Sequence, residues 1–247
     1  MLRDSIDYKG TAVGKLFRRF LFPTVMGMVF SAVFVITDGI FVGRGIGSDA
    51  LAAVGSNGSL NNLIINVFMG LSIGTSIMVA RYYGAQDWKN VHEVVHTSML
   101  LSAVCGVVLV FIGVILAAPL LELMGTPEDV LDQAVLYMRI IFVGMPALMI
   151  YNFGAAILRA VGDTQRPLIF LLIAGVINVV LNLFFVIVFH MGVAGVALAT
   201  IISQCVSAAL VVGCLVRSNG AYQLHLKQLC VQKDKLTQVV QVGLPAG

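Results

Sequence analysis

Six segments of the 247-residue sequence are mostly apolar over the length that a membrane-spanning helix requires. A helix that crosses the hydrocarbon core of a bilayer needs about 20 apolar residues, and it satisfies its backbone polar groups internally. The segments lie at approximately 16–43, 51–80, 94–118, 133–158, 167–190 and 192–216. They lack the alternation of apolar and polar residues that is typical of membrane strands. The sequence therefore predicts an all-α, polytopic membrane protein.

Composition agrees with this class. Hydrophobic residues make up 59% of the chain and charged residues 11%, with a mean hydropathy of +0.99. Soluble domains carry about 25% charged residues, so an ordinary soluble domain is excluded. Cys105, Cys205, Cys214 and Cys230 fall within or just after apolar segments without paired spacing, which favours buried thiols over a disulfide framework or a zinc site. The N-terminus lacks the pattern of a removable signal peptide.

The positions of Lys and Arg predict the orientation. Of the 15 basic residues, all except Arg44 and Arg139 precede or begin the first segment, follow the sixth, or lie in the second-to-third or fourth-to-fifth connection. Basic residues gather on the cytoplasmic side of a membrane protein. We therefore expect a multi-pass protein of the cytoplasmic (inner) membrane, with its N-terminus and residues 217–235 in the cytoplasm.

The last 31 residues suggest a two-part organisation. Residues 217–235 are polar and basic, and "LTQVVQVGLPAG" at 236–247 begins another apolar segment. Its lead, proline and glycine resemble "KLFRRFLFPTVMG" at the first segment. We expect a six-helix lobe at 1–216, a cytoplasmic linker at 217–235 and the truncated start of a seventh helix at 236–247. This is the pattern of the front half of a protein with an internal repeat.

A lone carboxylate stands out in the first segment. Asp38 is the only ionisable residue between Arg19 and Arg44. A charge within a membrane costs at least a few kcal/mol, so such residues usually face the bundle interior and bind an ion, a proton or a partner. The alternative is that Asp38 lies near the interface and is hydrated.

Two amides and a hydroxyl are candidate partners for Asp38. Asn178 and Asn182 are four residues apart and share one face of a helix, and Thr200 lies in the next segment. Amides offer carbonyl oxygens to a cation and N–H donors to a carboxylate. The alternatives are that the asparagines only join helices and that Thr200 bonds its own backbone. Pro23 removes a backbone hydrogen bond and predicts a kink or hinge in the first helix, although proline is also common in membrane helices.

Enzymatic motifs are not evident in the sequence. There is no glycine-rich phosphate loop, and no Ser/His/Asp or Cys/His set can be argued from spacing. His92 and His96 are four residues apart but have no third ligand nearby. We therefore expect no enzyme, no cofactor and no nucleic-acid partner.

Three stretches together resemble the N-terminal lobe of the MATE family of multidrug and toxic compound extrusion transporters. The first is "FPTVMGMVFSAVFVITDGIFVGRGIGSDALAAVG", with Pro23, Asp38 and Gly43. The second is "GAAILRAVGDTQRPL", close to the family pattern LRG-x-GDT-x-x-P, with Ala160 where glycine is usual. The third is "INVVLNLFFVIVFHMGVAGVALAT". The resemblance runs through the whole chain.

The resemblance implies one lobe of a twelve-helix fold with a central cavity. Family members export cationic and amphipathic compounds in exchange for sodium ions or protons. In the NorM-like and DinF-like branches the N-lobe cation site is similar to Asp38, Asn178, Asn182 and Thr200, which would also be the sodium ligands. Some members have Asp where this chain has Asn182, so the identity of the coupling ion stays open. The implied partners are small amphipathic or cationic substrates, the lipid bilayer and a C-terminal lobe.

Two other interpretations remain open from the sequence. One is a lipid-linked oligosaccharide flippase or exporter of the same superfamily, although the basic cavity residues expected for a pyrophosphate-bearing lipid are not evident. The other is a membrane scaffold or a non-functional half-length fragment. The lone carboxylate with its candidate amide partners argues against a scaffold.

Overall fold

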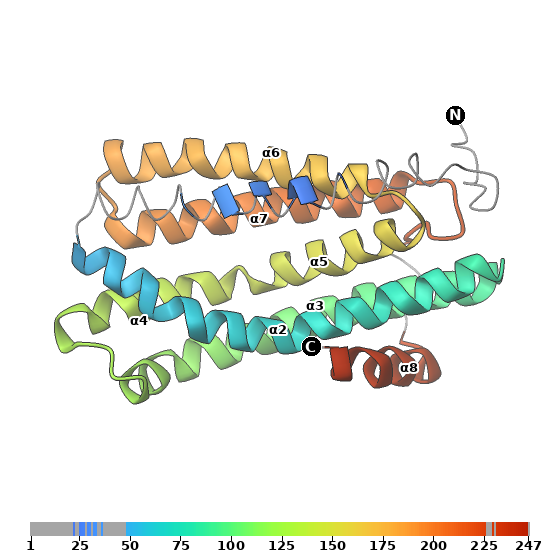
Figure 1. Ribbon diagram of the computed structural model, residues 1–247, viewed down its shortest axis with the longest axis horizontal. Coiled ribbons are helices and arrows are strands. Elements are labelled where there is room, and N and C mark those ends of the chain that lie inside the picture. The colour runs from blue at the N-terminus through green and yellow to red at the C-terminus, as the bar shows by residue number, and fades with distance from the viewer. Residues whose placement is uncertain are drawn as a thin grey trace.

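The structure is a computed structural model that describes residues 22, 25–27, 29, 30, 32, 33, 36, 48–225, 229 and 231–246. Within these residues there is no strand, and the long helices lie roughly along one axis (Figure 1). The elements are α2 (Ser48–Gly84), α3 (Trp88–Leu123), α4 (Glu128–Val143), α5 (Met145–Ala160), α6 (Gln165–Asn182), the π-helical segment η1 (Leu183–Val188), α7 (Gly192–Arg217), α8 (Lys233–Gly243) and the 3-10 turn η3 (Leu244–Ala246). The expected first helix, 16–43, lies largely outside the described residues, and the nine of its positions that are described are helical.

Several of the expected spans match the described helices. By length and composition, α3, α6 continued by η1, and α7 are each able to cross a membrane. These helices contain the expected spans at 94–118 and 192–216 and most of the one at 167–190. The expected span at 51–80 falls within α2. The all-helical fold class is therefore confirmed for the described residues.

The sequence predicted a single helix at 133–158, and this prediction is corrected by the structure. In the structure it is two helices, α4 and α5, which bend by 47° at Gly144. Pro146 lies in the first turn of α5. Proline has no N–H to donate, and its ring clashes with the carbonyl four residues earlier, which is that of Phe142. The proline in the middle of the apolar segment therefore explains why the span is bent.

Glycines on α3 allow α4 and α5 to approach closely at this bend. A Cβ on Gly106 would lie 2.4 Å from Cα of Pro146, and one on Gly113 would lie 1.9 Å from Cγ of Phe142. Phe142 is fully buried. Side chains from α3, α4 and α5 form most of the core of the bundle. Its largest fully buried members include Phe142, Phe153, Leu109, Leu121, Met138, Met145, Met149 and Ile157.

The connections fall into two groups at the two ends of the bundle (Figure 1). The α2–α3, α5–α6 and α7–α8 connections lie at one end, together with α8. The α3–α4 connection and the turn from η1 to α7 lie at the other. The first group contains the connections that carry the excess of Lys and Arg. The structure thus brings the predicted cytoplasmic connections to one end, and their orientation in a membrane stays a prediction.

The helix near the C-terminal end begins earlier than expected. Helix α8 starts at Lys233, within the expected linker at 217–235, and α7 extends to Arg217. Gln232, the residue before α8, donates its backbone N–H to Oγ1 of Thr97 at 3.2 Å. Lys235 is 8% exposed, because α8 packs along α2 and α3. Tertiary contacts, rather than hydropathy, therefore position this helix.

Candidate functional site

The two asparagines of α6 are buried in an otherwise apolar helix. Asn178 is 6% exposed and Asn182 is fully buried. They lie one turn apart, so their side chains share the face of α6 that packs against α7. Apolar neighbours such as Val176 and Val180 are instead exposed on the outer surface. The helical period therefore sends the amides inward and the aliphatic side chains outward.

Hydrogen bonds connect these amides to Thr200 on α7. Nδ2 of Asn182 donates to Oδ1 of Asn178 at 3.2 Å, and Nδ2 of Asn178 donates to Oγ1 of Thr200 at 3.4 Å. Oγ1 of Thr200 in turn donates to the backbone oxygen of Val196 at 3.0 Å. The structure thus brings three of the four predicted cation-site residues together. We call Asn178, Asn182 and Thr200 the amide cluster.

The amide cluster offers oxygen atoms in a region of low dielectric. Two amide oxygens and one hydroxyl oxygen are ligands of the type that hard cations prefer. The cluster has no carboxylate of its own, so it can solvate a cation but cannot neutralise one. Asp38, the predicted carboxylate, and Pro23, the predicted hinge, lie outside the described residues. Their predicted roles stay predictions.

A π-helical segment follows the amide cluster and was not foreseen from the sequence. Asn182 is the last residue of α6, and η1 begins at the next residue. Phe189 donates its N–H to the oxygen of Phe184 at 3.0 Å, a bond across five residues. π-Helical turns are rare and are frequent at functional sites, because they redirect the side chains that precede and follow them.

Gly195 on α7 makes room for this segment. A Cβ on Gly195 would lie 2.9 Å from Cβ of Phe185 and 3.0 Å from Cβ of Met191. The close approach of α7 to η1 positions the end of α6, where Asn182 lies. The sequence shows the glycine, but it does not indicate the π-helical segment that packs against it.

Gln204 extends the polar face of α7 towards the bend between α4 and α5. It follows Thr200 by four residues and therefore lies on the same face of α7. Its buried Oε1 atom has no hydrogen-bond partner among the described residues. A Cβ on Gly144, at the bend, would lie 3.1 Å from this oxygen. An acceptor buried in this way carries a cost in free energy unless a ligand or water meets it.

The histidines have a structural arrangement. His92 and His96 stack with ring centroids 3.9 Å apart. Nε2 of His96 accepts the backbone N–H of His225 at 3.0 Å, and its Nδ1 contacts the oxygen of His92 at 2.8 Å. Both ring nitrogens of His96 are therefore in use. Within the described part of the chain, no group of three His, Cys, Asp or Glu residues is arranged to hold a metal ion.

Comparison with known proteins places the chain in a family. A model of the MatE family matches residues 23–184, which is more than half of the sequence. The chain belongs to the MatE family. MatE proteins are membrane transporters, which agrees with the expectation of a transporter rather than an enzyme.

Relatives and solved structures agree with this assignment. The probable multidrug resistance protein YoeA of Bacillus subtilis is 32% identical over 234 residues, which cover 92% of this chain and 50% of YoeA. A transporter of the MOP superfamily from Pyrococcus furiosus has a TM-score of 0.87 at 30% identity, covering 94% of this chain and 51% of that one. A multidrug resistance MATE transporter in an outward-facing conformation has a TM-score of 0.85 at 30% identity, covering 92% and 51% of the two chains.

The chain spans about half the length of the relatives it matches. This MatE chain therefore corresponds to one lobe of the family fold. The membrane-embedded class, the all-helical architecture and the family resemblance drawn from the sequence are confirmed.

Proposed function

We propose that this MatE chain forms the N-terminal lobe of a cation-coupled antiporter, which exports small amphipathic or cationic compounds across the cytoplasmic membrane. The observation that carries the proposal is the amide cluster, because Asn178 and Asn182 are buried between apolar helices and bonded to Thr200. The multidrug resistance named for relatives such as YoeA supports the substrate class. The second lobe and the bilayer complete the transport pathway.

In this proposal Asp38 supplies the charge that the amide cluster lacks. The described Gly27 lies against α6, since a Cβ on it would be 3.5 Å from Cδ1 of Leu168. Asp38 follows Gly27 by 11 residues, and Asn178 follows Leu168 by 10. At about 1.5 Å per residue, a first helix that continued parallel to α6 would bring Asp38 to the level of Asn178.

Coupling would follow from the cost of an uncompensated charge. An ionised Asp38 in low dielectric needs a sodium ion or a proton, and losing it favours an arrangement in which the carboxylate is rehydrated or re-paired. A kink at Pro23 would let the first helix move between two arrangements. A substrate that prefers the cation-free state then drives release of the cation, because each ligand shifts the equilibrium only by its differential affinity.

Export from vesicles tests this proposal. The chain would be joined to its C-terminal lobe, reconstituted, and assayed with a cationic dye under an imposed sodium or proton gradient. Asp38→Asn should abolish gradient-driven export, and Asn182→Ala should weaken the dependence on the ion more than the affinity for the dye. The matched control is Asn152→Ala, because the hydrogen bond of Asn152 within the described part of the chain is local, from Nδ2 to the backbone oxygen of Leu148 at 2.9 Å. Unchanged rates and gradient dependence in Asp38→Asn would refute the proposed role.

The same reconstitution tests the flippase interpretation and the requirement for a second lobe. Lipid-linked oligosaccharide translocation without dye export would favour the flippase interpretation. We expect residues 1–247 alone to insert without transporting, because one lobe supplies one wall of the pathway.

A cysteine placed at Thr126, in a protein without its native cysteines, should react from outside intact cells if the N-terminus is cytoplasmic. Reaction only after permeabilisation would contradict this orientation.

A further inference from the structure

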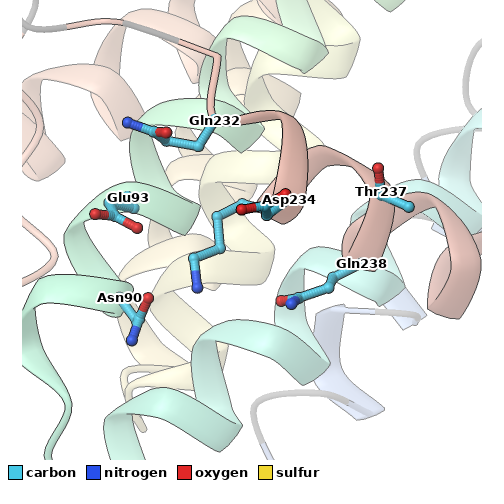
Figure 2. Close-up of a pocket in the computed structure, with 7 residues that line it drawn as sticks. Asn90, Glu93, Gln232, Asp234, Thr237 and Gln238 are labelled. Carbon is cyan, nitrogen blue, oxygen red and sulfur yellow. The ribbon is translucent and has the colours of Figure 1, made fainter.

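A polar cavity of about 500 Å³ lies where α8 docks beside the beginning of α3 (Figure 2). Its volume is within the range of small-ligand sites. No lining side chain is hydrophobic, although 59% of the residues of this chain are. The lining residues are Asn90 and Glu93 of α3, and Gln232, Asp234, Lys235, Thr237 and Gln238 of α8 and the residue that precedes it. We call it the α3–α8 cavity.

Lys235 brings a buried positive charge to this cavity. It is 8% exposed, and its Nζ donates to the hydroxyl of Tyr82 at 3.1 Å and lies 4.4 Å from the centroid of that ring. Tyr82 donates in turn to Oε1 of Gln238 at 2.9 Å. These partners are neutral, and no carboxylate among the described residues lies within 4.0 Å of the ammonium. The carboxylate of Asp87 also interacts electrostatically with Lys235. An ammonium has three N–H donors, and among the described residues Tyr82 is the one hydrogen-bond acceptor of this group.

Two carboxylates line the same cavity. Glu93 extends from α3 and Asp234 from α8, and neither makes a hydrogen bond or an ion pair to another described residue. Figure 2 shows Asn90 and Glu93 on one side of the cavity and Asp234 and Gln238 on the other. An anion alone would meet both carboxylates, and a cation alone would meet Lys235. A ligand with one negative and one positive group can meet both Lys235 and the two carboxylates of the cavity.

The cavity lies at the level of the bundle where lipid headgroups are expected. Trp88, the single tryptophan of the chain, begins α3 two residues before Asn90 and is 48% exposed. Tryptophan is enriched at membrane–water interfaces. Val91, Val94 and Val95 follow immediately and are fully buried. The polar cavity therefore sits beside the point at which α3 becomes apolar.

We propose that the α3–α8 cavity binds a zwitterionic headgroup that carries a phosphate and a primary ammonium. This chemistry is shared by phosphatidylethanolamine and soluble phosphoethanolamine. Lys235 donates to a phosphate oxygen, and Glu93 and Asp234 accept from the ligand ammonium, each through a charge-assisted hydrogen bond. A choline headgroup has the same charges without the ammonium N–H groups and should bind less well.

Native mass spectrometry of the delipidated chain in detergent tests this site. Phosphatidylethanolamine, phosphatidylcholine and phosphatidylglycerol with identical acyl chains would be titrated separately. We expect one retained phosphatidylethanolamine, at least about ten-fold tighter than either other lipid, because the hydrogen bonds that they cannot make are charge-assisted. Lys235→Met and Glu93→Gln should each remove most of that preference.

Matched controls separate binding from folding. Lys233→Met changes an exposed lysine of the same helix, and Glu122→Gln changes an exposed glutamate at the far end of α3. Both should bind as the unchanged chain does. If Lys235→Met does not fold, Glu93→Gln decides, because no hydrogen bond or ion pair joins this carboxylate to another described residue, and its interaction with His92 is electrostatic.

Equal binding of the three lipids, or an unchanged preference in Glu93→Gln, would overturn the proposal. Soluble phosphoethanolamine added as a competitor distinguishes the two sources of the headgroup. Displacement of the lipid would support the headgroup alone as ligand, and lack of displacement would support the intact lipid.

Discussion

Gly74 on α2 and Gly243 at the end of α8 are in direct backbone contact. A Cβ on Gly74 would lie 2.8 Å from the backbone nitrogen of Gly243, and one on Gly243 would lie 2.8 Å from the oxygen of Gly70. No side chain fits between the two helices at this point. Small residues of this kind allow helices in membranes to pack at short distance.

Gly74→Val should therefore displace α8 from α2. Overpacking a close contact costs about 1–3 kcal/mol, and the variant should unfold at a lower temperature in detergent. Gly84→Val on the same helix is the control, because a Cβ there has no neighbour within 4 Å. Valine has a higher helix propensity than glycine, and this difference applies to both variants. Equal thermal stability of the two would show that α8 does not dock as described.

The bend between α4 and α5 depends on Gly113. Gly113→Ala would place a Cβ 1.9 Å from Cγ of the buried Phe142. We expect a loss of about 1–3 kcal/mol, since Phe142 has no free space into which it can move. Gly213→Ala on α7 should be neutral or slightly stabilising, because nothing lies within 4 Å of its Cβ and alanine favours a helix. Denaturant unfolding of both variants measures the difference.

Two side chains of α3 hold the connection between α7 and α8. His96→Phe removes the acceptor of the His225 N–H, and Thr97→Val removes that of the Gln232 N–H. A lost hydrogen bond of a buried group costs about 1–3 kcal/mol. Hydrogen exchange should therefore speed up at His225 in the first variant and at Gln232 in the second. The same pattern in both variants would mean that the connection opens as one unit.

Thr200 connects the two helices of the amide cluster. Thr200→Val keeps the shape of the side chain but leaves Nδ2 of Asn178 without its acceptor, and we expect a loss of about 1–3 kcal/mol. Thr200→Ser keeps the hydroxyl and should retain most of the stability. If the amide cluster also binds a cation, added sodium should stabilise the serine variant more than the valine variant against heating. The reverse order would argue against Thr200 as a ligand.

Asp87 gives the beginning of α3 a dependence on pH. Hydrogen bonds from the side chain and backbone of Asn90 lower the pKa of Asp87 below its ordinary value of 3.8. Asp87 is the N-cap residue of α3, where its carboxylate accepts the backbone N–H of Asn90. Because its pKa is lowered in the folded state, the ionised carboxylate stabilises the fold at pH values above the ordinary pKa. This stabilisation is lost as the pH falls through the lowered pKa of the folded state. Asp87→Ala should destabilise the chain at neutral pH and make no difference in strong acid. Asp132→Ala, at an exposed position of α4, is the control for the loss of a carboxylate.

Hydropathy predicted the helices that are long and apolar enough to cross a membrane. The spans at 94–118, 167–190 and 192–216 were predictable because an apolar segment of this length has few alternatives in a bilayer. The spacing of Asn178 and Asn182 also predicted their shared face, since the period of a helix is a local property. The grouping of the basic connections at one end follows from the same succession of spans.

Contacts between helices decided the bend between α4 and α5 and the π-helical turn after α6, which hydropathy does not predict. Pro146 was visible in the sequence, but a proline in a membrane span bends it only to the extent that neighbours fill the space, and here Gly106 and Gly113 allow them to do so. The π-helical turn after Asn182 likewise depends on the room left by Gly195 on another helix.

The sequence by itself determined the membrane class, most of the described spans, and which polar residues of α6 face inward, because these follow from hydrophobicity and helical period along one segment. Only the tertiary structure decided that Thr200 reaches Asn178, that α8 begins at Lys233, and that Lys235 is buried against Tyr82. These features join residues 22 to 153 positions apart. Such contacts depend on how whole helices pack against one another, and no local pattern in the sequence encodes that packing.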